Sequence, residues 1–484
     1  MISFLVSLAI LIGGYFVYGL IVERVFGIDE SRKTPAITHA DGVDFVPLPA
    51  WKVFLVQFLN IAGLGPIFGA IMGIMYGPAA FLWIVLGTLF AGGVHDFVSA
   101  MISIRSGGVS LPEIVGRELG MSVKQVMRAF SVVLLILVGG VFVVTTSGLL
   151  ASLTPQSLDA TFWATVIFIY YLMATLFPVD KLIGNIYPVF AIVLFFMAVG
   201  LVWVMLFGDV AVPEAFSGGL SNRYAPELLS THPIFPMLFI SIACGAISGF
   251  HATQSPLMAR CIKSERLARP IFYGAMVAEG IVALIWAAAT IAFTGGYEGL
   301  GEYMAISGHT PGSLVHDISI EWFGIVGGTI AMIGVIAAPI TTGDTALRSA
   351  RLIVADFTGF SQTKFWQRVV VCIPLFALTF ALMQIDFNVL WRYFAWSNQT
   401  LSVFTLWACT VFLARYRRAY IITLVPALFM TVVCTAYLLT APTPEGFGLD
   451  QSIGLVVGLV LAILFSALFY RYLRTMEPNI APAD

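Results

Sequence analysis

Charged residues are scarce in this chain of 484 residues: Asp, Glu, Lys and Arg together make up 10% of it, whereas 59% of the residues are apolar. Ordinary soluble domains carry about 25% charged residues, so the composition excludes a soluble enzyme and a disordered protein. The formal net charge of −2 offers no basic excess for binding nucleic acid. With a mean hydropathy of +0.96, these values predict a polytopic helical protein whose surrounding partner is the lipid bilayer.

Sequence motifs for metal, nucleotide or hydrolytic chemistry are also missing. The five cysteines have no CxxC spacing, which predicts buried free thiols and no metal site. The chain has no Walker A motif, no HExxH and no GxSxG. Thr342-Gly343-Asp344 matches only part of the GxGD motif of intramembrane aspartyl proteases. We therefore expect no cofactor and no enzymatic activity; an intramembrane enzyme is a remote alternative, and a channel is a further one.

Apolar stretches divide the chain into membrane spans, each of which needs about 20 residues. No connection between them is long enough for a separate globular domain, so we expect a single membrane domain, 1–484. The sequence predicts about thirteen spans, at 2–22, 53–76, 79–104, 126–151, 161–177, 186–208, 234–258, 271–294, 322–345, 366–385, 389–414, 420–440 and 450–473.

The basic residues predict the orientation of these spans. If the N-terminus lies outside, all but two of the 24 Lys and Arg residues, with Arg348 and Arg351 among them, fall in the inner loops, the exceptions being Arg223 and Arg392. Basic side chains beside a span resist translocation. Segment 295–321 carries four acidic residues and no basic one, which fits an outer loop. We therefore expect a periplasmic N-terminus and a cytoplasmic C-terminus.

Two of the spans do not form clean helical patterns. The second contains Gly63, Gly65, Pro66 and Gly69, and the seventh is interrupted by glycines around Ser248. Glycine and proline at this depth free backbone groups that lipid cannot satisfy. For the second span, close packing along Gly65, Gly69 and Gly73 is the alternative.

The two interrupted spans lie five apart in order, so they run in opposite directions. Paired interrupted helices in inverted halves mark the binding site of secondary transporters. We expect a five-plus-five inverted repeat, with repeat A at 53–208 and repeat B at 234–414. One helix with a cytoplasmic loop, 1–52, precedes the repeats, and two helices, 420–473, follow them.

Polar residues at and beside these interruptions are the candidates for binding a small-molecule substrate. A half-helix N-terminus suits a carboxylate, and neutral amide or imidazole groups can add hydrogen bonds. For Asn398 and Gln399, interhelical hydrogen bonding is the alternative. The predicted substrate-binding residues are Asn60, Gly63, Gly65, Ser248, Gly249, His251, Thr253, Gln254, Asn398 and Gln399.

Ionisable residues inside the spans are candidates for ion coupling. His95 and Asp96 lie at the inner end of the third span, where they could relay protons or form a structural pair. Glu279 lies within the eighth span, where it is either a coupling group or a neutral core carboxyl.

The ninth span contains a second group of coupling candidates, Thr341, Thr342 and Asp344. Their oxygens, with carbonyls freed in the second span, would suit a hard cation. An ion pair of Asp344 with Arg348, one turn later, is the alternative. We expect H⁺ as the coupling ion, with Na⁺ as the alternative.

The order and spacing of several short motifs resemble the carbon starvation protein CstA family. These motifs run through most of the chain, and together they are specific. They are Asp41-Gly-Val-Asp44-Phe-Val-Pro47, Ile61-Ala-Gly-Leu-Gly-Pro66-Ile-Phe-Gly69, Gly92-Gly-Val-His95-Asp96-Phe97, Pro178-Val-Asp180-Lys181, Gly245-Ala-Ile-Ser248-Gly-Phe-His251-Ala-Thr253-Gln254-Ser255, Asp344-Thr-Ala-Leu-Arg348 and Asn398-Gln399.

The resemblance implies a LeuT-like fold of the amino acid, polyamine and organocation transporter class. It also implies uptake of peptides or pyruvate across the bacterial inner membrane during carbon starvation, with proton coupling for pyruvate. A Na⁺-coupled symporter for peptides or amino acids is the alternative. The sequence leaves the oligomeric state open.

Overall fold

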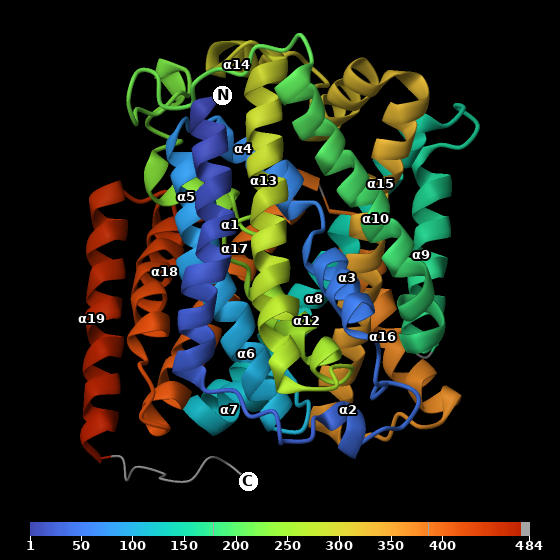
Figure 1. The fold of residues 1–484 in the computed structure, drawn as a ribbon, viewed down its shortest axis with the longest axis vertical. Helices are drawn as coiled ribbons and strands as arrows, with labels where there is room; N and C mark the ends of the chain where they lie inside the picture. Colours follow the sequence, from blue (N-terminus) through green and yellow to red (C-terminus); the bar gives the residue numbers. More distant parts are fainter. Residues whose placement is uncertain (178, 386, 476–484) are drawn as a thin grey trace.

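The computed structural model describes residues 1–177, 179–385 and 387–475, without the side chains of 179–186 and 387–388. Pro178 of the Pro178–Lys181 motif therefore lies outside the described residues, as do the side chains that follow it. All regular elements in the described ranges are helical, and Figure 1 shows their arrangement as a bundle. The predicted fold class, an all-α membrane protein, is confirmed.

Most of the helices run along one direction of the bundle. In the first half they are α1 (Ile2–Phe26), α2 (Pro35–Thr38), α3 (Ala50–Ile61), α4 (Ala70–Ile74), α5 (Ala79–Gly87), α6 (Gly93–Arg105), α7 (Leu111–Leu119), α8 (Met121–Leu153), α9 (Ala160–Leu176) and α10 (Val179–Phe207). In the second half they are α11 (Phe239–Ser241), α12 (Gly249–Ala259), α13 (Gly274–Phe293), α14 (Tyr297–Ala305), α15 (Pro311–Thr358), α16 (Phe365–Leu382), α17 (Phe387–Arg415), α18 (Ile421–Thr440) and α19 (Gln451–Thr475).

The predicted spans coincide with these helices. Among the described residues, nine helical segments are long and apolar enough to cross a membrane, and the bent pair α3–α4 makes a tenth. The remaining predicted spans coincide with α9, with α17 and with the interrupted segment 234–259. Helix α19, at the edge of the bundle in Figure 1, and helix α1 expose large apolar side chains, as lipid contact requires.

Helix α15 is much longer than the predicted span 322–345. Gly324, with φ 67°, breaks it into an outer part and a long spanning part that continues to Thr358. The sequence pattern placed Arg348 and Arg351 at the edge of an inner loop, and this placement is wrong. Both lie inside the helix and are fully buried, where Asp44 and Gln362 of two loops and the Ala174 carbonyl supply polar contacts that a hydropathy pattern does not reveal.

The two ends of the bundle carry different loops. The N-terminus and α14 lie at one end in Figure 1, whereas α2 and α7 lie at the other. The N-terminal ammonium is 2.8 Å from Oε1 of Glu214, which ties α1 to the loop after α10. We call these ends the α14 face and the α7 face. The loops predicted to be periplasmic and cytoplasmic, respectively, lie on them.

Candidate functional site

The second span is broken where its glycines and proline predict a break. Helix α3 ends at Ile61, and Ala62 leaves helical geometry with ψ 48°. A π-helical turn, Gly65–Gly69, then leads into α4, and the two halves are bent by 54°. The break leaves carbonyl groups of α3 free of helical partners.

The seventh span is broken at the same depth in the opposite half of the chain. Residues 242–248 form turns between α11 and α12, and the two breaks touch. A Cβ atom on Gly65 would lie 2.3 Å from Cβ of Cys244, and one on Gly69 would lie 2.9 Å from the carbonyl oxygen of Ser241. Packing and unwinding are therefore not alternatives at these glycines: the missing side chains let two unwound segments meet.

Asn398 of α17 holds the start of α12 in place. Its Oδ1 accepts hydrogen bonds from the Ser248 hydroxyl at 2.9 Å and from the backbone N–H of Phe250 at 2.7 Å. Its Nδ2 contacts the Cys244 sulfur at 3.4 Å. The amide oxygen thus occupies the helix N-terminus, a position that favours negative charge.

Gln399 and Gly249 complete the contact between α17 and the broken span. Nε2 of Gln399 donates to the Ile247 carbonyl at 2.9 Å. A Cβ atom on Gly249 would lie 2.3 Å from both the Asn398 carbonyl oxygen and the Ser402 nitrogen. Both predicted amides therefore make interhelical hydrogen bonds, and Gly249 is a packing position.

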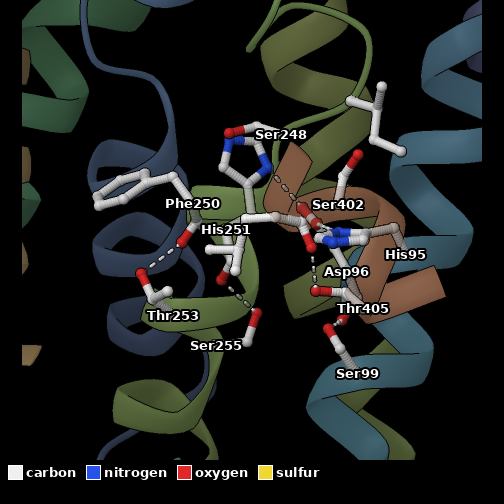
Figure 2. Close-up of polar contacts among 12 residues, drawn as sticks. His95, Asp96, Ser99, Ser248, Phe250, His251, Thr253, Ser255, Ser402 and Thr405 are labelled. Carbon is white, nitrogen blue, oxygen red and sulfur yellow. Dashed lines mark hydrogen bonds and ion pairs between the residues drawn. The ribbon is translucent and has the colours of Figure 1, made fainter. Parts of the chain in front are cut away.

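A buried chain of ionisable side chains runs beside this contact. In Figure 2, His251 and His95 converge on Asp96. Nδ1 of His95 lies 2.7 Å from Oδ1 of Asp96, and Nδ1 of His251 lies 2.9 Å from Oδ2. Nε2 of His251 lies 3.4 Å from Oε2 of Glu279 in α13. All four side chains are fully buried.

The geometry of His251 constrains where protons can sit. Its two ring nitrogens each face a carboxyl group, Asp96 on one side and Glu279 on the other. A neutral imidazole donates from one nitrogen and accepts at the other. Hydrogen bonds to both acids therefore require a proton on one carboxyl group or a second proton on the ring. Glu279, His251 and Asp96 are thus contiguous, but only the contact of His251 with Asp96 is a hydrogen bond: Nε2 of His251 and both carboxyl oxygens of Glu279 have no hydrogen-bond partner among the described residues.

Cys244, His251 and Glu279 also come close enough to raise the question of a metal. One donor atom from each lies within 4.8 Å of the others, and all three residues are buried. Each of the first two already has a partner in the protein: Cys244 contacts Ser248 and Asn398, and His251 contacts Asp96. The contact of His251 with Asp96 uses Nδ1; Nε2 of His251 and both carboxyl oxygens of Glu279 have no hydrogen-bond partner among the described residues.

Thr341 and Thr342 lie where α15 passes the break in the second span. The Thr342 hydroxyl donates to the Leu59 carbonyl at 3.2 Å, with its own helix as the other acceptor. The Thr341 hydroxyl bonds carbonyls of its own helix only, among the described residues. Thr345, one turn later, contacts Oδ1 of Asn60 at 3.4 Å. Threonine and carbonyl oxygens thus meet between α3 and α15, as a hard-cation site requires.

Asp344 faces a different part of the bundle. Its Oδ2 accepts from Tyr170 of α9 at 3.0 Å and from Tyr187 of α10. Arg348, expected as its alternative partner, instead donates to the Ala174 carbonyl and lies 3.7 Å from Asp44. Asp344 therefore points toward α9 and α10, whereas Thr342 points toward α3.

The predicted residues Thr253 and Gln254 belong to α12 and lie next to α15. The Thr253 hydroxyl bonds within its own helix, to Phe250. Nε2 of Gln254 contacts the Ser349 hydroxyl at 3.4 Å, while its Oε1 has no partner among the described residues. Gly63 lies in the break of the second span, where a Cβ atom on it would meet Phe142 and Thr342.

A cavity of about 610 Å³ leads from the α14 side toward this region. Phe68 and Trp391 line it, with ring centroids 6.2 Å apart. Behind them, Phe394 lies 5.6 Å from Trp391 and 5.9 Å from Phe142. This aromatic cluster lies between the cavity and the break at Gly63.

Sequence reasoning missed several partners in the site. Tyr170 and Tyr187 give no signal, since tyrosines in apolar spans resemble ordinary core residues. The Leu59 carbonyl is a backbone group, which no side-chain motif marks. Asp44 appears in a predicted family motif, but its contacts with α15 follow only from the tertiary structure.

Comparison with known proteins identifies relatives of this chain. The model of the carbon starvation protein CstA family matches residues 1–162 and 151–326. An uncharacterized membrane protein of Haemophilus influenzae is 41% identical over 60% of this chain and 91% of its own length. The peptide transporter CstA of Campylobacter jejuni is 29% identical over 77% of this chain and 62% of its own. The pyruvate/proton symporter BtsT of Escherichia coli is 27% identical over 58% of this chain and 47% of its own length.

Solved structures show the same architecture at low identity. MhsT, solved in complex with L-phenylalanine, superposes with a TM-score of 0.53 at 14% identity, covering 87% of this chain and 98% of that one. The E129A mutant of the Eremococcus coleocola manganese transporter gives a TM-score of 0.51 at 12% identity, covering 90% of this chain and 99% of that one.

These neighbours have the LeuT fold, which confirms the predicted architecture. The named homologues and the structural neighbours are transporters, which supports the expectation that the chain is not an enzyme. By the match over most of its length and by its relatives, the chain belongs to the carbon starvation protein CstA family.

Proposed function

We propose that this protein is a proton-coupled symporter that imports a small organic nutrient, pyruvate or a short peptide, across the bacterial inner membrane during carbon starvation. Alternating access would rock one set of helices against the other around the two breaks. The N-terminus and the α14 face would be periplasmic, and the α7 face and the C-terminus cytoplasmic. The names of the peptide and pyruvate/proton transporters among the relatives support this substrate class.

The observation that carries proton coupling is the position of His251 between two buried carboxyl groups. A proton arriving at Glu279 passes to Nε2 of His251, and the ring releases the proton on Nδ1 to Oδ2 of Asp96. His251 stands two residues after the start of α12, next to the N–H of Phe250 that Asn398 binds. A change of charge at His251 therefore acts directly on the broken span.

A substrate carboxylate would bind at the N-terminus of α12, where Asn398 Oδ1 now accepts the Phe250 N–H. The helix dipole favours negative charge there. Asn398 Nδ2 and Gln254 would supply further hydrogen bonds. A peptide would add an ammonium group, for which Glu279 or the freed carbonyls of the broken spans are the available acceptors.

Na⁺ coupling is the second candidate, and the contact of Thr342 with the Leu59 carbonyl favours it. Here the ion would bridge α15 and the broken α3, as oxygen donors at that junction permit. The two candidates predict different ion requirements. Only the first requires Asp96 and His251.

Purified protein in proteoliposomes separates these possibilities. We expect labelled pyruvate or a labelled dipeptide to accumulate under an inward proton gradient without Na⁺, and a protonophore to abolish the accumulation. Asp96→Asn should abolish it as well, whereas Asp209→Asn, an exposed loop residue, should not. Accumulation that requires Na⁺ and survives Asp96→Asn would favour the second candidate. Absence of transport for both substrates under every gradient would contradict both.

A further inference from the structure

Three arginines gather at the α7-face ends of α15 and α16, around a single loop carboxylate. Arg348 and Arg351 of α15 are fully buried, and Arg368 of α16 is 8% exposed. Asp44, in the loop before α3, is 7% exposed. Its Oδ1 lies 3.4 Å from Nη2 of Arg351 and 3.7 Å from Nη1 of Arg348. Asp44 therefore meets both arginines of α15 through one oxygen.

These contacts leave the guanidinium groups poorly satisfied. Within the described residues, Nε of Arg348, Arg351 and Arg368 and Nη1 of Arg348 and Arg368 have no hydrogen-bond partner. A well-made pair of arginine and carboxylate is bidentate, with N–O distances of about 2.8 Å. Buried cations are retained only with compensation. The cluster thus has more donors than its one contacting carboxylate can serve.

Neighbouring groups account for only part of the remaining donors. Nη2 of Arg348 donates to the Ala174 carbonyl, and Nη1 of Arg351 donates to Gln362 at 2.8 Å. Asp344 lies one turn from Arg348 but accepts from tyrosines.

The loop presents Asp44 as a preformed anion. Oδ1 of Asp41 accepts the backbone N–H groups of Val43, Asp44 and Phe45, which fixes the turn. Burial raises the pKa of Asp44, but the charges of Arg351, Arg348, Arg260 and Arg368 together outweigh burial and hold the pKa below its ordinary value. Asp44 is therefore ionised at neutral pH, like a substrate carboxylate.

A cavity of about 650 Å³ on the α7 face reaches Asp44, behind which the three arginines lie without lining the cavity themselves. Asp44 and Gln362 line the cavity, and both contact Arg351. On the other side, α15 carries Ser349 beside Arg348, and Ser349 contacts Gln254 near the two breaks. Along α15, Arg348, Ser349 and Arg351 thus precede Leu352 and Ala355, which line the cavity.

We propose that Arg348, Arg351 and Arg368 form a carboxylate-binding subsite at the α7-face exit, and that Asp44 is its built-in occupant. A substrate carboxylate leaving the central site replaces Asp44 on the arginines, and the loop then returns. The subsite favours a carboxylate over a neutral solute, and so it deepens and rests on the proposed function. The full burial of Arg348 and Arg351 favours a small solute over a lipid headgroup.

The test is ligand-dependent thermal unfolding of the full chain in detergent, with pyruvate and its neutral amide as probes. Removing the occupant in Asp44→Asn should make millimolar pyruvate raise the melting temperature by several degrees more than it does in wild type, where only the central site is open, since ligand binding to the folded state stabilises it. The amide should have no effect. Adding Arg351→Gln to Asp44→Asn should abolish this additional shift and leave only the shift seen in wild type, and Asp209→Asn should behave as wild type.

The subsite is overturned if pyruvate shifts Asp44→Asn no more than wild type, or if the additional shift persists in the double variant. If Asp44→Asn does not fold, the KM for pyruvate leaving proteoliposomes from the α7 face decides the question. Arg351→Lys should raise this KM about tenfold and leave the KM at the α14 face unchanged; equal changes at both faces overturn the subsite. If the wild type transports pyruvate but the variants show neither the additional melting shift nor the change in KM, only the subsite is refuted. If the additional melting shift is seen but the wild type transports no substrate, only the proposed function is refuted.

Discussion

The side-chain oxygen of Asn398 accepts the backbone N–H of Phe250 at 2.7 Å, although the two residues lie 148 positions apart in the chain. The same oxygen accepts the Ser248 hydroxyl. One amide therefore fixes the N-terminus of α12 against α17. The amide thus joins the broken seventh span to α17, the helix that also carries Gln399.

Asn398→Ala should destabilise the protein more than Gln399→Ala does. The first change leaves two buried donors without an acceptor, at a cost of about 1–3 kcal/mol each. The second leaves only the Ile247 carbonyl without its donor. Thermal unfolding in detergent measures both variants. Equal melting temperatures for Asn398→Ala and wild type would show that the contact does not hold α12.

Gly249→Ala should disrupt the contact between α12 and α17. The new methyl group would lie 2.3 Å from the Asn398 carbonyl oxygen and the Ser402 nitrogen, both of which are backbone atoms. The helices must separate, so we expect substrate uptake to fall at least tenfold, an effect of about 1.4 kcal/mol or more. Gly13→Ala in α1 is the matched control, because a Cβ atom there meets nothing within 4 Å. Normal uptake by Gly249→Ala would refute the role of this packing.

Thr342→Ala tests the cation site between α3 and α15. If transport is proton-coupled, as we propose, the variant should keep its dependence on the proton gradient and its insensitivity to Na⁺. Thr342→Ser, which retains the hydroxyl that donates to Leu59, is the control. The informative measurement is uptake as a function of Na⁺ concentration. A Na⁺ requirement in wild type that is weakened in Thr342→Ala and restored in Thr342→Ser would assign coupling to this site.

Glu118 of α7 should make the stability of the protein depend on pH. Burial raises its pKa from 4.5 to about 7, and the nearby Arg415 only partly offsets this effect. Between these values the folded state holds a proton that the unfolded chain has lost, so stability falls as the pH rises from 4.5 to 7. At roughly 1.4 kcal/mol per pKa unit, the loss is about 3 kcal/mol.

Thermal unfolding across this pH range measures the effect. Glu118→Gln removes the titrating group and should flatten the dependence. The ion pair of Glu118 with Arg415, 3.2 Å apart, is lost in this variant at high pH, which lowers the plateau without restoring the slope. An unchanged slope in Glu118→Gln would assign the pH dependence to another group.

The spans and their two breaks could be predicted from the sequence because their signals are local. Hydrophobic length marks a span, and glycine with proline marks a break, as at Gly65 and Pro66. Even Asn398 and Gln399 could be placed at membrane depth. Their hydrogen-bonding role was predicted as one of two alternatives, and the structure shows these bonds.

The partners of these residues could not be predicted, because contacts between distant helices leave no local pattern. Asp96 and His251 lie 155 positions apart, and Arg351 and Asp44 lie 307 apart. Arg351 itself was assigned to an inner loop because a basic residue beside a span usually lies there. Only the packing of α15 against its neighbours shows that it is buried.

The most direct test of the central claim, that His251 and Asp96 carry a proton with the substrate, is the internal pH of proteoliposomes during pyruvate addition. We expect pyruvate to drive rapid acidification inside vesicles that hold wild-type protein. Asp96→Asn and His251→Gln should abolish this acidification, while Asp209→Asn should leave it intact. Saturable pyruvate uptake through the wild type without any acidification, or acidification that persists in Asp96→Asn, would contradict the account.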